Sequence, residues 1–420
     1  MDLLEAPTVL SEANHHHTRC SKNEILQQQP RPHPHAGARD ECGNFGYLHD
    51  PTIIPSKQSQ LRLREDIVSL KDYYEHNVCS VPFGQGTEGP GGYEALKKIK
   101  VSPPFYVHSN NNSTSGEPRQ LKLLCMIYSV ATDHNLQMIK AVRETWGSRC
   151  DGFLVASNVT NATLGMVDIP HLGAEEYQSM WQKVRSMWSY VYDTPQLYEE
   201  YDFFYISGDD TYVIVENLRR MIHEAYTGTV PKDPNWIPTP WRELEQWEEK
   251  FPDQPDQRPY YLGAIMHNGK HRYVCAGGAG YVLNRSALKY LIESLNTTQP
   301  NAIDPREDFF VAAGLRSQGI ACSDTRDANG AWRFHHLDAE FQYNWKHPAQ
   351  KALWMPESLK RNRGISARLG VDGVSEYSVS FHLTRNQQHP TSPDRLRRYH
   401  AIIYGLCNPS NDTGTLLYTS

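Results

Sequence analysis

The segment Phe203-Phe204-Tyr205-Ile206-Ser207-Gly208-Asp209-Asp210-Thr211-Tyr212-Val213 passes from an apolar run into two adjacent carboxylates. Aromatic and β-branched residues fill the run, which predicts a buried strand over residues 202–207. In open α/β sheets, ligands bind outside the carboxyl ends of the strands, where Asp209 and Asp210 would emerge. Adjacent carboxylates at that edge suit a hard divalent cation that holds a diphosphate. The alternative interpretation is a solvated Asp-Asp turn.

Strand-like and helix-like patterns alternate on both sides of this segment. Further strands are predicted over residues 121–130, 152–157, 260–265 and 376–383, and helices over 135–145, 175–192, 215–225, 286–294 and 307–317. Alternation on this scale predicts an α/β fold, in which helices cover both faces of a Rossmann-like, mostly parallel sheet. Residues 227–259 are rich in Pro, Trp and Glu, interrupt the pattern, and are predicted to form a surface insertion.

The composition argues against several classes of protein. A formal net charge of −6 over 420 residues argues against a nucleic-acid partner, because such binding needs a basic face. The eight cysteines include no Cys-x-x-Cys pair, which argues against a zinc ribbon or a thioredoxin-like site. Asn-x-Ser/Thr sequons favour a lumenal location, where disulfides form, and they lie at Asn111, Asn112, Asn158, Asn161, Asn284, Asn296 and Asn411.

The first 118 residues differ in composition from the rest of the chain. Residues 1–60 are rich in His, Gln, Pro and Ser and are predicted to be disordered, and residues 61–118 are predicted to be a stem-like region that ends in a linker. No stretch has the length and apolarity of a signal peptide or a membrane span. Either the protein is soluble, or an anchor is encoded upstream of this sequence. Residues 408–420 are predicted to form a C-terminal tail.

Five short motifs follow one another at spacings typical of one enzyme family. They are Arg143-Glu144-Thr145-Trp146-Gly147, Gly208–Val213, Gly277-Gly278-Ala279-Gly280-Tyr281-Val282-Leu283, Glu307-Asp308 and Ser380-Phe381-His382. The series resembles the core 1 β1,3-galactosyltransferases of glycosyltransferase family 31, the group that includes the Fringe enzymes. The resemblance covers roughly residues 120–405 and implies one catalytic domain of the GT-A fold over residues 119–407. It also implies inverting, Mn²⁺-dependent transfer of a sugar, most specifically galactose from UDP-galactose in a β1,3 linkage to O-linked N-acetylgalactosamine.

The resemblance assigns the metal and the catalytic base. Asp210 matches the last acid of the family's Asp-x-Asp motif, and His382 matches a late metal-binding histidine; a core histidine is the alternative for His382. Carboxylate and imidazole ligands together suit Mn²⁺. Asp308, with Glu307 beside it, matches the family's catalytic acid pair, in which the second acid is the base. The alternative is that both acids are first-turn carboxylates favoured by the helix dipole.

Five further residues are predicted to contact the UDP-sugar: Ser129, Arg143, Asp209, Gly277 and Gly278. The two glycines would allow close approach of the backbone to the donor sugar, and a simple turn is the alternative. Arg143 could instead form a surface salt bridge. The resemblance further implies a glycan or glycoprotein acceptor, a Golgi or secretory location for a membrane-anchored enzyme, and admits a homodimer.

The pattern departs from the family at Gly208, where an acid is expected. The alternative function is therefore a non-catalytic relative, either a folding chaperone or a glycan-binding protein. Retention of Asp210, the Glu307-Asp308 pair and His382 favours an enzyme. A separate prediction concerns Cys125 in the first strand and Cys150 just before the second, because neighbouring strands would bring them close enough for a disulfide.

Overall fold

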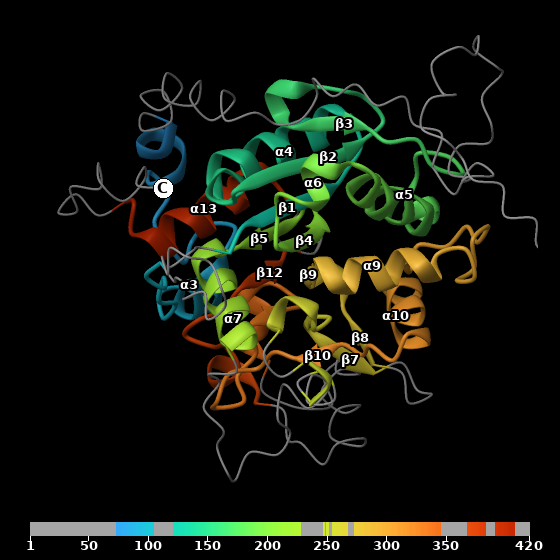
Figure 1. The fold of residues 1–420 in the computed structure, drawn as a ribbon. Coiled ribbons are helices and arrows are strands. Elements are labelled where there is room, and N and C mark those ends of the chain that lie inside the picture. The colour runs from blue at the N-terminus through green and yellow to red at the C-terminus, as the bar shows by residue number, and fades with distance from the viewer. Residues whose placement is uncertain are drawn as a thin grey trace, which may run out of the picture.

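The computed structural model describes residues 73–104, 121–227, 247, 249–251, 254–267, 273–345, 368–383 and 391–407. The central sheet has seven strands in the order β10-β6-β9-β4-β1-β2-β3 (Figure 1). Their bounds are β1 Leu123–Tyr128, β2 Gly152–Ser157, β3 Met166–Asp168, β4 Phe203–Gly208, β6 Tyr261–Gly263, β9 Tyr281–Asn284 and β10 Ser323–Asp324. Strands β1 to β4 are mutually parallel, β10 is parallel to β6, and β9 is antiparallel to both of its neighbours. The predicted mostly parallel α/β sheet is confirmed, and it is consistent with the GT-A fold.

Helices cover both faces of this sheet. The main ones are α4 Asp133–Thr145, α5 Met180–Asp193, α7 Val215–Thr227, α9 Arg285–Ser294, α10 Glu307–Ser317 and α13 Pro393–Tyr404. The connections that contain α4 and α5 run in opposite directions along the sheet, so the right-handed crossover rule puts these helices on opposite faces. Helices α9 and α10 pack with α5, and α13 packs with α4 (Figure 1). Shorter helices are α3 Gly89–Leu96, α6 Pro195–Tyr198 and α11 Ala339–Asn344.

Side-chain caps set where three of these helices begin. Thr132 accepts the N–H of Asn135 at the start of α4, and Ser392 caps α13 in the same way. Asn284 caps α9 and is buried, with its amide also bonded to the backbone of Tyr260 and Arg258. Its sequon is therefore closed to glycosylation in the folded chain, because a glycan acceptor must reach the surface.

A second sheet brings distant motifs together. It contains β11 Phe334–His335, β12 Ser380–His382 and β5 Thr211–Val213, and a separate hairpin pairs β7 Ile265–His267 with β8 Tyr273–Cys275. Strand β12 is antiparallel to β5, with His382 opposite Thr211. The predicted strand over residues 376–383 is thus confirmed in its last part. Its pairing places the late histidine beside the acidic step that follows β4.

Residues 73–104 lie against the globular part, although they fall in the segment predicted to be stem-like. Helix α3 packs on α11. The buried Arg398 side chain donates to both carboxylate oxygens of Glu88, at 2.5 and 2.6 Å. A disulfide joins Cys79 to Cys407, 328 positions later. The domain boundary at residue 119 stays a prediction, as do the properties of residues 1–60 and 408–420, which lie outside the described residues.

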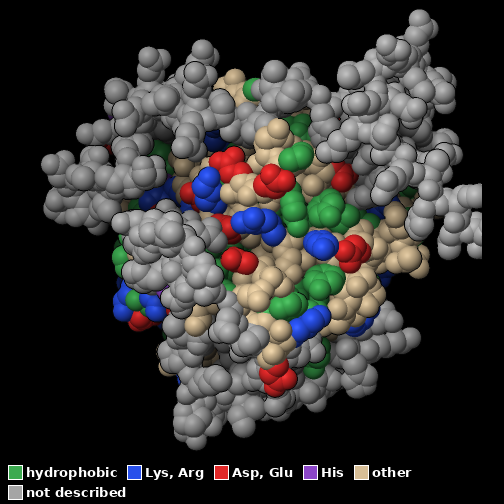
Figure 2. Space-filling model, viewed as in Figure 1, with side chains coloured by type: hydrophobic (Ala, Val, Ile, Leu, Met, Phe, Trp, Pro, Cys, Tyr) green, Lys and Arg blue, Asp and Glu red, His purple; other side chains and the backbone are tan. Residues whose placement is uncertain are grey.

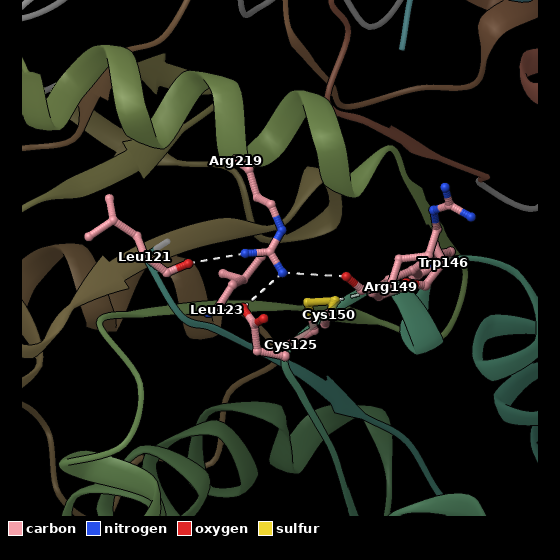
Figure 3. Close-up of a disulfide and its surroundings, with 8 residues drawn as sticks. Leu121, Leu123, Cys125, Trp146, Arg149, Cys150 and Arg219 are labelled. Atoms are coloured by element: carbon pink, nitrogen blue, oxygen red, sulfur yellow. Dashed lines mark hydrogen bonds and ion pairs between the residues drawn. A yellow bond between two sulfur atoms is a disulfide. The ribbon is translucent and has the colours of Figure 1, made fainter. Parts of the chain in front are cut away.

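The predicted disulfide between Cys125 and Cys150 is confirmed, with a Cα–Cα distance of 6.0 Å (Figure 3). Arg219 of α7 links the two segments near this disulfide. It donates to the backbone oxygen of Leu121 at 3.1 Å and to the side-chain carboxylate of Asp151 at 2.8 Å. A third disulfide joins Cys275 to Cys322. Within the described part of the chain, every cysteine is therefore bonded to another.

No helix among the described residues combines the length and the apolarity that a membrane crossing requires. Acidic and basic side chains lie side by side on the coloured part of the face that Figure 2 shows, with apolar side chains between them.

Most of the predicted insertion at 227–259 lies outside the described residues, but its Trp247 is buried and packs against Tyr290 of α9.

Candidate active site

The carboxyl edge of the parallel strands gathers the first group of predicted residues. Asp209 follows β4, and its Oδ2 accepts hydrogen bonds from Ser129 Oγ at 2.5 Å and from Asn135 Nδ2 at 2.7 Å. Ser129 follows β1, and Asn135 lies in the first turn of α4. Burial and the neighbouring Asp210 raise the pKa of Asp209, while the two donors oppose that rise. Asp209 is thus fixed to two other elements of the edge.

Asp210, the next residue, contacts His382. Asp210 Oδ2 and His382 Nε2 are 3.2 Å apart, and both side chains are partly exposed. The Nδ1 atom of His382 lies 3.2 Å from the backbone oxygen of His336, which can accept its proton and leave Nε2 turned toward Asp210. Burial opposes a charge on His382, but the carboxylate of Asp210 and the His336 carbonyl outweigh it and raise the pKa of His382.

The Asp210–His382 pair fits a cation that takes both oxygen and imidazole ligands. The backbone contact that orients the His382 ring is the kind of support that metal-binding histidines have. Within the described residues, no group of three or more His, Cys, Asp or Glu side chains is arranged to hold a metal. Asp210 and His382 could therefore hold Mn²⁺ only together with oxygens from outside this set, such as those of a diphosphate or water.

The predicted base lies at the beginning of α10. Asp308 Oδ2 accepts the backbone N–H of Gly277 at 3.0 Å, and Oδ1 accepts the N–H of Phe309 at 2.9 Å. Burial raises the pKa of Asp308, and the two N–H donors and the charge of Arg306 oppose that rise. An elevated pKa with a partly exposed carboxylate is what a general base working near neutral pH needs.

Glu307 differs from its neighbour because it is buried. Its Oε2 accepts a hydrogen bond from Tyr281 of β9 at 2.9 Å, and only 3% of the residue is exposed. Burial, and secondly the charge of Asp308, raise the pKa of Glu307 well above its ordinary value. Glu307 therefore keeps its proton where Asp308 loses its own, so only Asp308 of the pair suits the role of base.

The turn Gly277–Ala279 separates the acid pair from the histidine. A Cβ atom on Gly277 would lie 2.0 Å from Glu307 Oε1, and one on Gly278 would lie 2.5 Å from His382 Nδ1. Thr211 Oγ1 fixes the turn by donating to Gly278 O at 2.9 Å. Both glycines therefore allow close packing against Glu307 and His382, and the predicted contact of the two glycines with the donor sugar stays a prediction.

Arg143 is the one predicted site residue that the structure does not bring to this edge. It lies in the last turn of α4, eight residues after Asn135, which corresponds to a rise of roughly 12 Å. Its guanidinium donates to the backbone oxygen of Thr163. A helix that follows a parallel strand runs back toward the opposite edge, so its last turn points away from a site at the carboxyl edge.

Several residues of the site had no motif to reveal them. Asn135 contacts Asp209, Tyr281 contacts Glu307, and His336 orients His382. Tyr128 ends β1 directly beside Gly208. A sequence signal existed only for Asn135, because the first turn of a helix that follows β1 must lie at the carboxyl edge.

Comparison with known proteins supports the same family. No family model matches this chain. The chain is similar to the Xenopus laevis protein "Glycoprotein-N-acetylgalactosamine 3-beta-galactosyltransferase 1", with 24% identity over 261 residues. The match covers 62% of this chain and 63% of the relative, so it spans less than two thirds of the relative's length. The resemblance to core 1 β1,3-galactosyltransferases that the motifs indicate is confirmed.

Proposed function

We propose that this chain is an inverting, metal-dependent glycosyltransferase that uses a UDP-sugar. The observation that carries the proposal is the placement of Asp308 on one side of the Gly277–Ala279 turn and of the Asp210–His382 pair on the other. A displacement at a sugar carbon needs a base on the acceptor side and charge stabilisation on the leaving-group side. The two kinds of group are separate here and are held by a shared turn.

Each residue has a defined task in this proposal. Asp308 accepts the proton of the acceptor hydroxyl while that oxygen bonds to the anomeric carbon, and UDP leaves with the electron pair of the broken carbon–oxygen bond. Asp210 and His382 would hold Mn²⁺, which supplies charge neutralisation for the diphosphate. Ser129 and Asn135 hold Asp209 at the nucleotide side. Glu307 accepts a hydrogen bond from Tyr281 and packs against Gly277 of the turn.

The family resemblance and the similarity to the Xenopus protein support a finer proposal for the donor and the acceptor. We propose galactose as the donor sugar, a β1,3 linkage, and O-linked N-acetylgalactosamine on a glycoprotein as the acceptor. A secretory or Golgi location is proposed with it. The three disulfides support that location, because such bonds persist in oxidising compartments.

A donor screen on the purified chain tests the proposal. UDP-galactose, UDP-glucose and UDP-N-acetylglucosamine are each incubated with and without Mn²⁺, and both transfer and hydrolysis are measured. Transfer of one sugar in the presence of Mn²⁺ is expected, and an N-acetylgalactosamine acceptor should increase UDP release. No turnover of any donor together with no metal-dependent UDP binding would favour the non-catalytic relative that the missing acid at Gly208 suggests.

A further inference from the structure

The space beside Gly208 is already occupied. Tyr128 and Gly208 are register partners on the neighbouring parallel strands β1 and β4. A Cβ atom on Gly208 would lie 2.8 Å from Asp210 Oδ1 and 3.3 Å from Cε2 of the Tyr128 ring. A carboxylate side chain at position 208 would therefore displace both groups. The absence of the expected acid is what allows the Tyr128 ring to lie across the end of β4.

The Tyr128 hydroxyl can donate a hydrogen bond at the candidate active site. Burial raises the pKa of this hydroxyl well above its ordinary value. The hydroxyl therefore stays protonated and can donate a hydrogen bond. Among the residues that the structure describes, none forms a hydrogen bond with this hydroxyl. Its oxygen is also not one of the fully buried polar atoms that lack a partner. Tyr128 is half-buried, so its side chain keeps some accessible surface at the end of β1.

We propose that Tyr128 binds the sugar ring of the UDP-sugar and replaces the missing acid as a donor-binding group. The inference rests on the proposed function. Asp210 marks the diphosphate end of the donor and Asp308 the acceptor end, so the transferred sugar must lie between them. Tyr128 lies beside Gly208, on the side where Asp210 also lies. It offers two contacts that a sugar ring uses: a hydroxyl that donates to a sugar oxygen, and an aromatic face that packs against C–H groups.

The experiment compares binding of UDP with binding of UDP-sugars in Mn²⁺, using calorimetry. Tyr128→Phe should leave the dissociation constant of UDP within about twofold of wild type, because UDP lacks the sugar. It should weaken the best-binding UDP-sugar by about three- to tenfold, the scale of one hydrogen bond. The steady-state KM for that donor should rise by a similar factor.

Tyr201→Phe is the matched control, because Tyr201 is also buried but precedes β4 at the opposite edge of the sheet. It should change neither dissociation constant. If Tyr128→Phe weakened the binding of UDP and of the UDP-sugar equally, or weakened neither, the inference about Tyr128 would be overturned. The proposed function would still stand in that case, provided that the wild type binds UDP. Failure of wild type to bind UDP at all would overturn both.

Discussion

His382 Nε2 lies 3.2 Å from Asp210 Oδ2, although 172 positions separate the two residues along the chain. The antiparallel pairing of β12 with β5 creates this contact, since it sets His382 opposite Thr211, the residue after Asp210. Gly278 also lies close to the imidazole, because a Cβ atom there would be 2.5 Å from Nδ1 of His382. The position of His382 therefore depends on a strand pairing and on a missing side chain.

Gly278→Ala should displace His382, because the new Cβ would lie 2.5 Å from Nδ1 of the imidazole. We expect metal-dependent UDP binding to weaken by about tenfold or more, as it should in His382→Ala. The double variant should be little worse than either single one, because neighbouring residues that act together are not additive. Additive losses in calorimetry would contradict a shared role.

Glu307→Gln should stabilise the fold at neutral pH. Glu307 is protonated in the folded chain and ionised in the unfolded chain, because burial raises its folded pKa. Folding then takes up a proton, and stability falls as pH rises above the unfolded pKa of about 4.3. Glutamine keeps a partner for Tyr281 and takes up no proton, so its advantage in denaturant unfolding should be clear at pH 7 and should shrink toward pH 4.

The same variant separates the two acids by function. Transfer by Glu307→Gln should persist, with the loss of kcat on the acidic side of the pH profile at the wild-type position, because Asp308 is the group that must be ionised. Abolished transfer in a folded Glu307→Gln protein would make Glu307 the base and would contradict the assignment.

The buried ion pair between Arg398 and Glu88 should hold residues 73–104 in place. Arg398→Met leaves the Glu88 carboxylate buried without its cation, which costs about 3–5 kcal/mol in typical proteins. Lys97→Met removes an exposed pair with Glu94 and should cost far less, because water screens an exposed ion pair. Chemical denaturation measures both. Equal costs would mean that this segment is not an integral part of the fold.

The disulfide between Cys125 and Cys150 closes a short loop, with 25 positions between its ends. Its loss through a Cys125→Ala/Cys150→Ala double variant should lower the free energy of unfolding by about 3 kcal/mol. Peptide mapping of non-reduced protein from a secretory host should recover the two cysteines in one linked peptide pair. Recovery of both as free thiols would contradict the bond.

Much of the fold could be predicted from local patterns, because the parallel strands and their helices each carry a periodicity in sequence. The antiparallel insertion of β9 could not, since the direction of Tyr281–Asn284 depends on pairing with β4 and β6 rather than on its own residues. The docking of residues 73–104 was missed for a similar reason, because its partners, α11 and α13, lie more than 200 positions away along the chain.

The residues of the candidate site could likewise be predicted only in part. The motifs pointed to Asp210, His382 and Asp308, which the structure brings to the two sides of one turn, and their roles stay predictions. They misplaced Arg143, since a motif does not tell which end of a helix faces the site. They also missed Tyr128, whose importance arises only from the glycine beside it in the sheet.

The most direct test of the proposed roles measures UDP binding and sugar transfer together in Asp308→Asn and Asp210→Ala, each in the presence of Mn²⁺. Asp308→Asn should bind UDP like wild type and lose transfer by at least about a hundredfold, the scale of general base catalysis. Asp210→Ala should lose metal-dependent UDP binding. The reverse outcome, with UDP binding lost in Asp308→Asn and kept in Asp210→Ala, would contradict the assignment of base and metal ligand.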